Sequence, residues 1–300
     1  MTLPKLLSSV LLGTTLVVGC TSVTPQSKSI DDLLYNACTD GLYDNTDVCV
    51  VRNSLSNILE NTYLVLNKAT YVDAKGKTDV SISLGTANVY MDVGNKTYFT
   101  TAKHVVHNDK VATDDYGNEY TLKKTEMYLF TSKELTYINQ QRNKDKSIED
   151  ILKTMELKPT YVSAEHKELD IAMTYSDNFK HAPLAYKIGD SSQLQPSDKV
   201  IVVGYPLGYM LSVNEGKVSS TTGPSIIDDY KDTFTFDASI TLGNSGGGVF
   251  AVRDGVPELV GITSAMFTRG NDLNLCYKVD RFSELFTTGL NHCYVGWTCR

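Results

Sequence analysis

From Asn61 onward the chain consists mainly of short runs of β-forming residues separated by turn residues. Gly94-Asn95 and Asp254-Gly255 lie between alternating runs, as is typical of tight hairpin turns that need positive φ. No internal repeat of the solenoid or propeller kind is visible. The pattern therefore predicts an all-β fold with antiparallel neighbours. The expected strands are 63–66, 80–84, 88–93, 96–101, 170–175, 199–205, 233–240 and 249–252.

One polar stretch, 132–158, interrupts this pattern and predicts a helical insertion. Ser147 followed by Asp150 is typical of a helix N-cap, and Glu149 faces Lys153 at i,i+4. The apolar residues that fall on one helical face are Ile148, Ile151, Leu152 and Met155. The insertion is either a solvated surface excursion or a lid or regulatory element that covers one edge of a site.

Composition excludes several classes of protein. With 41% hydrophobic and 21% charged residues in 300, the chain should form one large or two small globular domains. A net charge of -7 argues against nucleic acid as a partner, because nucleic-acid binding needs a basic surface. No apolar run is long enough to form a membrane-spanning helix.

The first residues have the form of an export signal. Lys5 precedes an apolar stretch at 6–18, which is too short to span a bilayer. Val17-Val18-Gly19-Cys20 resembles the lipobox of bacterial lipoproteins, which implies removal of residues 1–19 and acylation of Cys20. The resemblance implies a membrane anchor on the periplasmic side of the outer membrane, since Thr21 and not Asp follows. An ordinary signal peptide or a core strand ending in Cys is the alternative.

Five further cysteines would remain in an oxidising compartment, so at least one should stay a free thiol. Two local disulfides, Cys38 to Cys49 and Cys293 to Cys299, would leave Cys276 as a buried thiol, although sequence does not fix this connectivity. No Cys-x-x-Cys pair supports zinc or thioredoxin-like chemistry.

Ser245 lies in the glycine-rich segment 241–248. Glycine at 243 would let its N–H turn toward an oxyanion beside that of Ser245, which favours a nucleophilic serine over a passive flexible loop. The segment also fits the G-x-S-x-G elbow of α/β-hydrolases. That fold needs a helix after the serine and a later triad histidine, whereas 249–263 reads strand, turn, strand and only His292 follows.

His104 is the best candidate for the general base. It follows the strand 96–101 and precedes Val105-Val106, a pair that would hold the imidazole rigidly at a strand end. His104 and His107 could instead be surface residues or metal ligands, but no third ligand at suitable spacing is evident.

Asp170 is the best candidate for the acid that orients this histidine. Polar residues precede it and Ile171, Ala172 and Met173 follow, so the carboxylate should lie where the chain enters the core. A buried carboxylate needs a partner, and an imidazole N–H would supply one. Capping of a strand is the structural alternative. The other acidic candidates, in turns that look exposed, are Asp109, Asp114 and Asp115.

Six segments, in order, resemble the chymotrypsin-like (trypsin-like) serine proteases, most closely the bacterial HtrA-like branch. They are TAKHVV (101–106), LDIAM (169–173), VGYPLG (203–208), NEGKVS (214–219), DASITLGNSGGGV (237–249) and VGITS (260–264). The resemblance implies two six-stranded antiparallel β-barrels with the site between them, and we expect a short C-terminal helix at 283–287. HtrA-like proteins usually carry a PDZ domain, but only 55 residues follow Ser245, so we expect no PDZ domain within these residues.

The expected organisation has four parts. Residues 1–19 are a signal peptide, 20–60 an N-terminal segment, 61–182 the first barrel with its insertion, and 183–300 the second barrel and tail.

The resemblance also implies a serine endopeptidase that acts on polypeptides without a cofactor or metal, through an acyl-enzyme. His104, Asp170 and Ser245 would form the triad, and the N–H groups of Gly243 and Ser245 the oxyanion hole. Residues expected to pair with substrate are Ser264, Ala265 and Met266, and those expected to line the primary pocket, which should accept small or medium apolar side chains, are Ser239 and Ile240. The alternative function is a catalytically silent lipoprotein that binds or chaperones envelope proteins.

Overall fold

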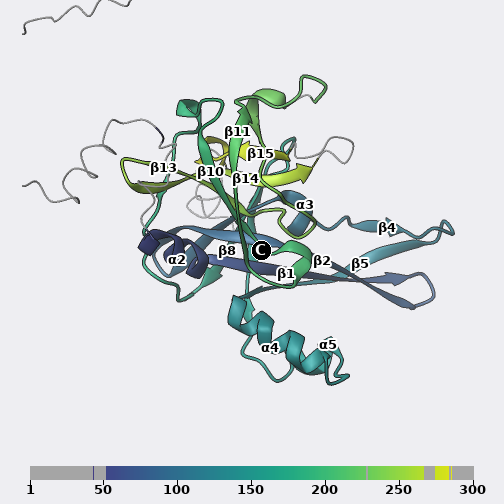
Figure 1. Ribbon diagram of the computed structural model, residues 1–300. Coiled ribbons are helices and arrows are strands. Elements are labelled where there is room, and N and C mark those ends of the chain that lie inside the picture. The colour runs from purple at the N-terminus through teal and green to yellow at the C-terminus, as the bar shows by residue number, and fades with distance from the viewer. Residues whose placement is uncertain (1–42, 44–51, 228, 267–273, 284, 286–300) are drawn as a thin grey trace, which may run out of the picture.

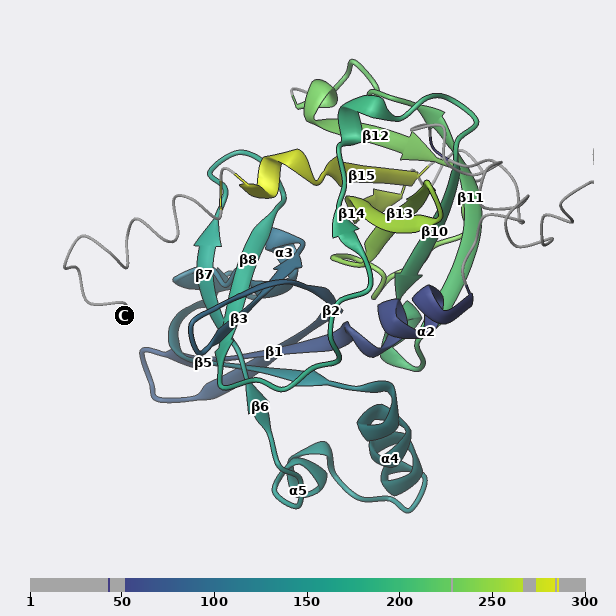
Figure 2. The same cartoon turned by 90° about the vertical axis from the view of Figure 1, so that its left-hand side faces the viewer.

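Two sheets, antiparallel except for one short pairing, make up most of this computed structural model, which describes Tyr43 and residues 52–227, 229–266, 274–283 and 285 (Figures 1 and 2). The strands are β1 (Thr62–Asp73), β2 (Thr78–Val93), β3 (Lys96–Thr101), β4 (Val111–Thr113), β5 (Glu119–Phe130), β6 (Lys158–Pro159), β7 (Tyr161–Glu165), β8 (Ala172–Asp177), β9 (Lys187–Ile188), β10 (Lys199–Gly204), β11 (Ser212–Ser220), β12 (Thr233–Phe236), β13 (Gly248–Arg253), β14 (Val256–Met266) and β15 (Asn274–Lys278). The helices are α2 (Arg52–Glu60), α3 (Lys103–Val106), α4 (Ser132–Arg142), α5 (Ile148–Leu152) and the 3-10 turns η2 (Ser191–Gln193), η3 (Pro206–Gly208) and η4 (Tyr230–Asp232). None of the described helices is long and apolar enough to cross a membrane.

The second sheet is a closed barrel. Its order is β13-β10-β11-β12-β15-β14, and β14 pairs back with β13, so that six strands form a ring. The short β9 adds to β14 in parallel. The interior is filled by buried apolar side chains, among them Val200, Phe234, Val249, Val260 and Cys276. Closure leaves these six strands without a free edge along most of their length.

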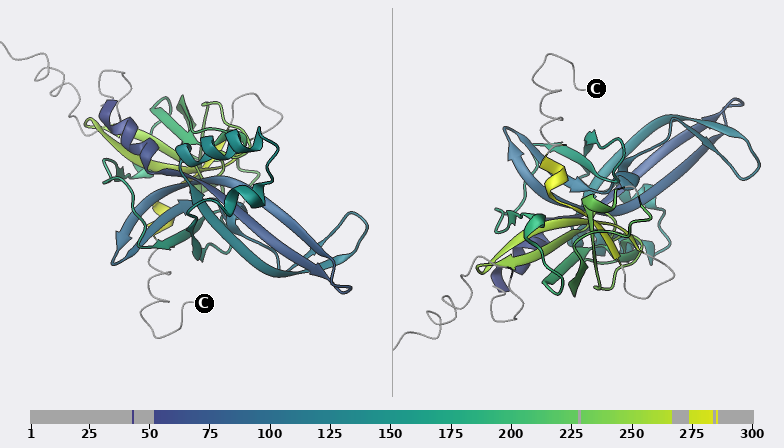
Figure 3. Two further views of the ribbon diagram at one scale, coloured as in Figure 1. Left: turned by 90° about the horizontal axis from the view of Figure 1, so that it is seen from below. Right: turned by 90° about the horizontal axis from the view of Figure 1, so that it is seen from above.

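The first sheet is curled and runs in the order β4-β5-β1-β2-β3-β8-β7. The short β6 pairs with β5 through Tyr128–Pro159 and Leu129–Lys158, and a single residue separates β6 from β7. This pairing brings the two sides of the curled sheet together. The ends of the β1–β2 and β4–β5 hairpins extend beyond the body as an arm (Figure 3). The predicted all-β, double-barrel architecture is confirmed.

Local turn chemistry is as predicted, but several strand bounds differ. Gly94, Asp254 and Gly255 have φ of 61°, 52° and 74°, the values that tight hairpins need. The predicted strands 80–84 and 88–93 are one strand, β2, because β1 pairs with it without interruption from Thr62 to Val72. β8 begins at 172 and not at 170. β12 ends at Phe236, since the carbonyl of Ala238 accepts from the Asn274 side chain instead of continuing the ladder.

The insertion contains α4 and α5, beneath the first sheet in Figure 1. Thr131 and Glu134 form a reciprocal capping box at the start of α4, and Glu134 also pairs with Lys158 at the far end of the insertion. The predicted N-cap of α5 is confirmed, with Ser147 accepting from Asp150 N at 3.1 Å. The predicted Glu149–Lys153 pair is wrong. Lys153, the C-cap residue of α5, keeps a helical backbone conformation and contacts Asp150 at 3.1 Å instead, because i,i+3 positions of a helix are neighbours just as i,i+4 positions are.

Two further helical segments pack where the sheets meet. In α2, Ile58 is buried, and the Asn57 side chain bonds to the chain between the sheets at Pro183 O (2.5 Å) and Ala185 N (2.7 Å). After β15 the helical residues begin at Asp280, three residues before the predicted start at 283, and Phe282 and Leu285 are buried. Residues 286 and 287 of the predicted helix lie outside the described part.

Candidate active site

The position of His104 follows from the end of β3. The chain leaves β3 at Thr101 and makes the helical turn α3, whose Val105 and Val106 are 0% and 2% exposed. These two valines fasten the turn to the core of the first sheet. The imidazole, between the strand end and the valine pair, stays half exposed and is accessible from solvent.

Asp170 lies in the bend before β8 and faces His104. Its neighbours Leu169 and Ile171 are both buried in the core between the sheets, so the side chain of Asp170 points the other way. The carboxylate accepts from His104 Nδ1 at 2.7 Å and from the His104 backbone N–H at 2.8 Å. The predicted pairing of these two residues is thus present in the structure.

This contact shifts the pKa of both groups. The hydrogen bond to Asp170 raises the pKa of His104 above its usual value, although burial opposes the shift. Burial would raise the pKa of Asp170, but the hydrogen bond and charge of His104 outweigh it and hold that pKa below its usual range. With Nδ1–H donating to a carboxylate, the free lone pair of the neutral ring is on Nε2, which bonds to no other described residue.

Ser245 lies in the loop between β12 and β13, and the first sheet holds this loop from one side. Three successive contacts come from β2: Thr86 Oγ1 to Gly243 O (2.8 Å), Thr86 N to Ser245 O (2.8 Å) and Asn88 Nδ2 to Gly246 O (3.0 Å). Gly246 has φ of 85°, and a Cβ there would lie 2.1 Å from Thr86 O. Glycine is therefore required for the two sheets to approach each other here.

Gly85 places Ser245 beside the helical turn that carries His104. A Cβ on Gly85 would lie 2.4 Å from Val105 Cγ2 and 2.9 Å from Ser245 O. The valine next to His104 and the backbone of Ser245 therefore share one small space. The Ser245 hydroxyl donates to Ser264 O at 3.4 Å, and no hydrogen bond joins it to His104 among the described residues.

Gly243 has a backbone conformation and surroundings that require glycine. Its φ is 90°, and a Cβ would lie 2.4 Å from Tyr205 O, so no other residue fits without displacing the chain. Within the part of the chain that the structure describes, the N–H groups of Gly243 and Ser245 donate to no acceptor. Two neighbouring unpaired donors beside a serine hydroxyl can bind a developing negative charge.

Ser264 contacts both Asp170 and Ser245, a role that the sequence did not reveal. Its hydroxyl donates to Asp170 Oδ2 at 2.5 Å and its carbonyl accepts from Ser245. Ala265 and Met266 continue β14, whose 264–266 segment pairs with β15 on one side only among the described strands. Ser239 is exposed and Ile240 half-buried in the loop before Ser245.

The remaining histidine and acid candidates are engaged elsewhere. His107 Nδ1 bonds to Glu165 at 2.8 Å and its Nε2 lies 3.5 Å from Asp109. Asp114 caps a turn through the N–H groups of Tyr116 and Asn118. Among the described residues, no group of three His, Cys, Asp or Glu could hold a metal ion.

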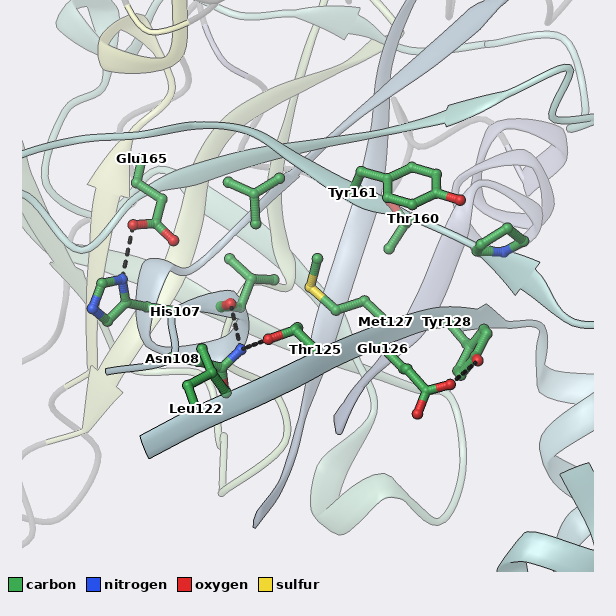
Figure 4. A pocket seen from close by; sticks show the side chains of 13 residues that line it. His107, Asn108, Leu122, Thr125, Glu126, Met127, Tyr128, Thr160, Tyr161 and Glu165 are labelled. Atoms are coloured by element: carbon green, nitrogen blue, oxygen red, sulfur yellow. Dashed lines mark hydrogen bonds and ion pairs between the residues drawn. The ribbon is translucent and has the colours of Figure 1, made fainter. Parts of the chain in front are cut away.

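A hollow of about 520 Å³ opens where β5 and β7 diverge in the first sheet, with His107 and Glu165 at one end (Figure 4). Neither His104 nor Ser245 lines it. His104 lines a second hollow of about 400 Å³ with the exposed face of β2, including Asp79, Ser81 and Ser83. Residues of the insertion line neither hollow, so α4 and α5 do not cover His104.

Cys276 is a free thiol and is fully buried, as expected. Burial raises the pKa of its thiol well above the usual value. Cys20 and the predicted pairs Cys38–Cys49 and Cys293–Cys299 lie outside the described residues.

Comparison with known proteins agrees with this geometry. A "Probable periplasmic serine endoprotease DegP-like" of Marinomonas is 41% identical over 83 residues, which cover 28% of this chain and 17% of that protein. A "Serine protease HtrA-like" of Staphylococcus epidermidis is 25% identical over 246 residues, 79% of this chain and 35% of that one. The chain thus spans at most 35% of the length of these two relatives.

A solved structure shares the fold. The crystal structure of the serine endoprotease from Yersinia pestis superposes with a TM-score of 0.52 at 16% identity, over 79% of this chain and 65% of that one. The trypsin-like peptidase domain family matches residues 85–262, more than half of the 300 residues and the part that holds His104, Asp170 and Ser245. This chain belongs to the trypsin-like peptidase domain family.

Proposed function

We propose that the protein is a serine endopeptidase, with Ser245 as nucleophile, His104 as general base and Asp170 as the residue that orients it. The observation that carries the proposal is the His104–Asp170 contact of 2.7 Å, held beside the Ser245 loop by the shared packing at Gly85. A histidine whose Nδ1–H is fixed by a carboxylate presents Nε2 for proton transfer.

In the first step the hydroxyl of Ser245 turns from Ser264 O toward His104 Nε2, a rotation about one side-chain bond. As Ser245 Oγ bonds to the carbonyl carbon of the substrate, its proton passes to Nε2 and the carbonyl oxygen becomes an oxyanion. His104 then gives that proton to the leaving amine as the peptide C–N bond breaks. Water attacks the resulting acyl-enzyme by the same route and releases Ser245.

The N–H groups of Gly243 and Ser245 bind the oxyanion. The positive φ of Gly243 and the absence of acceptors for these two donors among the described residues support this role. Removing one such donor typically costs about 2.7 to 4 kcal/mol in the barrier. The oxyanion site therefore contributes a large part of the rate.

The substrate is an extended polypeptide that adds a strand to β14 at Ser264, Ala265 and Met266. The second edge of this segment is unpaired among the described strands, which supports β-strand addition. Ser239 and Ile240 line the primary pocket. Asp237, the nearby acid, accepts from the backbone of Lys217 at 2.5 Å and is not available as a pocket floor, which favours small or medium apolar side chains.

The protein acts in the bacterial envelope, attached by lipid at Cys20. The lipobox-like sequence supports the attachment, and the relatives named periplasmic endoproteases support the location. Cells producing the full chain should carry it in the membrane fraction, and Cys20→Ser should move it to the soluble fraction. An unchanged membrane fraction for Cys20→Ser would contradict the anchor.

A fluorophosphonate probe tests the catalytic assignment, because it reacts only with an activated serine. The wild type should be labelled and should degrade fluorescent casein, whereas Ser245→Ala and His104→Ala should do neither. Ser192→Ala, a change at an exposed serine far from the site in sequence, is the control that should keep both activities. A folded wild type without labelling or proteolysis would reject the enzyme and leave the silent binding protein.

A further inference from the structure

The insertion reaches across to the second barrel, at the segment 205–211 that follows β10. Residues of α4 and α5 share one apolar cluster with Tyr205, namely Leu135, Ile138 and Ile151. The partly buried Leu211 packs against the same cluster. The helices that lie outside the first sheet are therefore packed against a loop of the other barrel.

Tyr205 is anchored in this cluster at several points. Its side chain is 0% exposed, its hydroxyl donates to Thr62 O at 3.2 Å, and its backbone N–H donates to Thr86 Oγ1 at 3.0 Å. Thr86 Oγ1 in turn donates to Gly243 O. One threonine thus joins the backbone of Tyr205 to the backbone of the proposed oxyanion site.

A second contact joins α4 to the same segment by a polar bond. The side-chain amide of Asn139 donates to Tyr209 O at 3.1 Å. Tyr209 N–H donates to Pro206 O at 3.1 Å, so Tyr209 is the C-cap residue that closes the tight turn η3. Asn139 therefore holds one end of the turn, while burial of Tyr205 holds the other.

The inner side of this turn lies against Gly243. Leu207 N–H donates to Leu242 O at 2.6 Å, and a Cβ on Gly243 would lie 2.8 Å from Leu207 N and 2.4 Å from Tyr205 O. Leu207 has φ of 54°, a conformation that a non-glycine residue keeps only where its surroundings enforce it. The insertion contacts the residues on either side of Leu207, at Tyr205 and at Tyr209 O.

The insertion is itself held as one unit. Glu134 bonds to Thr131 at the start of α4 and pairs with Lys158 where the insertion returns to β6. The pKa of Glu134 lies below its usual value: burial would raise it, but the bonds to Lys158 and Thr131 and the charge of Lys158 together outweigh burial. Joined ends give α4 a fixed position from which it can hold the turn.

We propose that α4 is a positioning element for the oxyanion site, and that Asn139 is a positioning residue that acts through Tyr209 and the η3 turn on the N–H of Gly243. This inference rests on the proposed function. Loss of the Asn139 contact lets the Leu207 conformation relax, and the Leu242–Gly243 backbone, which bonds to Leu207, loses its fixed direction. Transition-state binding then weakens, while binding of the uncleaved peptide does not.

The test compares Asn139→Ala and Asn139→Asp with Gln140→Ala. Aspartate keeps the size of asparagine but cannot donate, and Gln140 is the exposed next residue of the same helix. The substrate is a short peptide thioester ending in Val. Affinity for the matching peptide aldehyde, whose adduct oxygen occupies the oxyanion site, is compared with affinity for the peptide alcohol, which forms no adduct.

We expect both Asn139 variants to lose about tenfold in kcat and in aldehyde affinity, with KM and alcohol affinity within about twofold of the wild type. Gln140→Ala should match the wild type in all four quantities. Wild-type kcat and aldehyde affinity in the Asn139 variants would overturn the inference, as would equal losses of aldehyde and alcohol affinity. In either case, if the wild type is labelled by the fluorophosphonate, the proposed function stands and only the role of Asn139 is overturned. If the wild type is not labelled, the proposed function and the role of Asn139 are both overturned.

Discussion

Gly85 is the point where β2, the turn that carries His104 and the Ser245 loop meet, and we predict that Gly85→Ala separates base from nucleophile. The new Cβ would lie 2.4 and 2.6 Å from the two γ-carbons of Val105 and 2.9 Å from Ser245 O. Carbon atoms in contact are about 3.5 to 4.0 Å apart, so the neighbours must move by roughly 1 Å. Overpacking of this kind costs about 1 to 3 kcal/mol in the free energy of unfolding.

The effect on catalysis should exceed the effect on stability. A displacement of roughly 1 Å in a reacting geometry costs about 10²-fold in rate, whereas the stability loss lowers Tm by only about 2 to 12 °C. The assays are kcat/KM on a peptide thioester and thermal unfolding by circular dichroism. Thr78→Ala, at an exposed position of the same strand that does not line the hollow beside His104, is the control that should change neither.

A double variant identifies the clash that is responsible. Val105→Ala removes both γ-carbons, so Gly85→Ala combined with Val105→Ala should recover part of the activity that Gly85→Ala loses. If Gly85→Ala has wild-type kcat/KM and Tm, the close packing of the His104 turn against Ser245 is refuted. If the two substitutions are additive, the loss does not come from Val105.

Three further predictions follow from the titratable groups. Because Asp170 raises the pKa of His104 above 6.5 and only the neutral ring can accept a proton, kcat/KM should fall as pH drops through that raised pKa. Asp170→Asn should move this acid limb to lower pH and reduce kcat by about 10⁴-fold, and an unmoved limb in a pH–rate profile would contradict the assignment. Since the folded-state pKa of Glu134 is lowered, its contribution to stability is present above the pKa of the unfolded chain and is lost as pH falls through the lowered value. In Glu134→Gln, the free energy of unfolding, measured with urea, should therefore change less with pH over this acidic range than it does in the wild type. The same change with pH in both proteins would argue against the Lys158 contact. The thiol of Cys276, buried and with a raised pKa, should react with a maleimide only after unfolding, and rapid labelling of the native protein would disprove its burial.

The candidate triad was predictable because each member carries a local signal. Ser245 lies among glycines, and Gly243 and Gly246 do have φ of 90° and 85°. His104 follows a strand and precedes two valines that are buried. Asp170 lies between Leu169 and Ile171, whose burial fixes the side to which its carboxylate points. Such signals depend on residues within a few positions of each other, so a sequence can show them.

The residues that join the three parts could not be found in this way. Thr86 and Asn88 are ordinary polar residues of a strand, yet they donate to three carbonyls of the Ser245 loop. Ser264 was expected to pair with substrate, and its hydroxyl bonds to Asp170. These contacts span the junction of two sheets, and no pattern along the chain encodes a partner more than 90 positions away.

In the helical insertion, too, the local features were predictable from the sequence and the long-range contacts were not. Its cap at Ser147 was evident, since capping is decided within one turn of helix. The surface on which its apolar face packs was not evident. An apolar stripe indicates that one face of a helix is buried, but it does not indicate which part of the protein buries that face. Only the structure places Leu135 and Ile138 against Tyr205 of the second barrel.

The order of β runs, turns, glycines and polar candidates along the chain by itself indicated the fold class and the three members of the candidate triad. Each of those features arises from backbone conformation and side-chain alternation over short distances. Tertiary structure decided how the two sheets meet at Gly85, which hydroxyl donates to Asp170, and where α4 contacts the η3 segment next to Gly243. The physical reason is that close packing between distant segments depends on the complete fold, and a single missing or added carbon changes it.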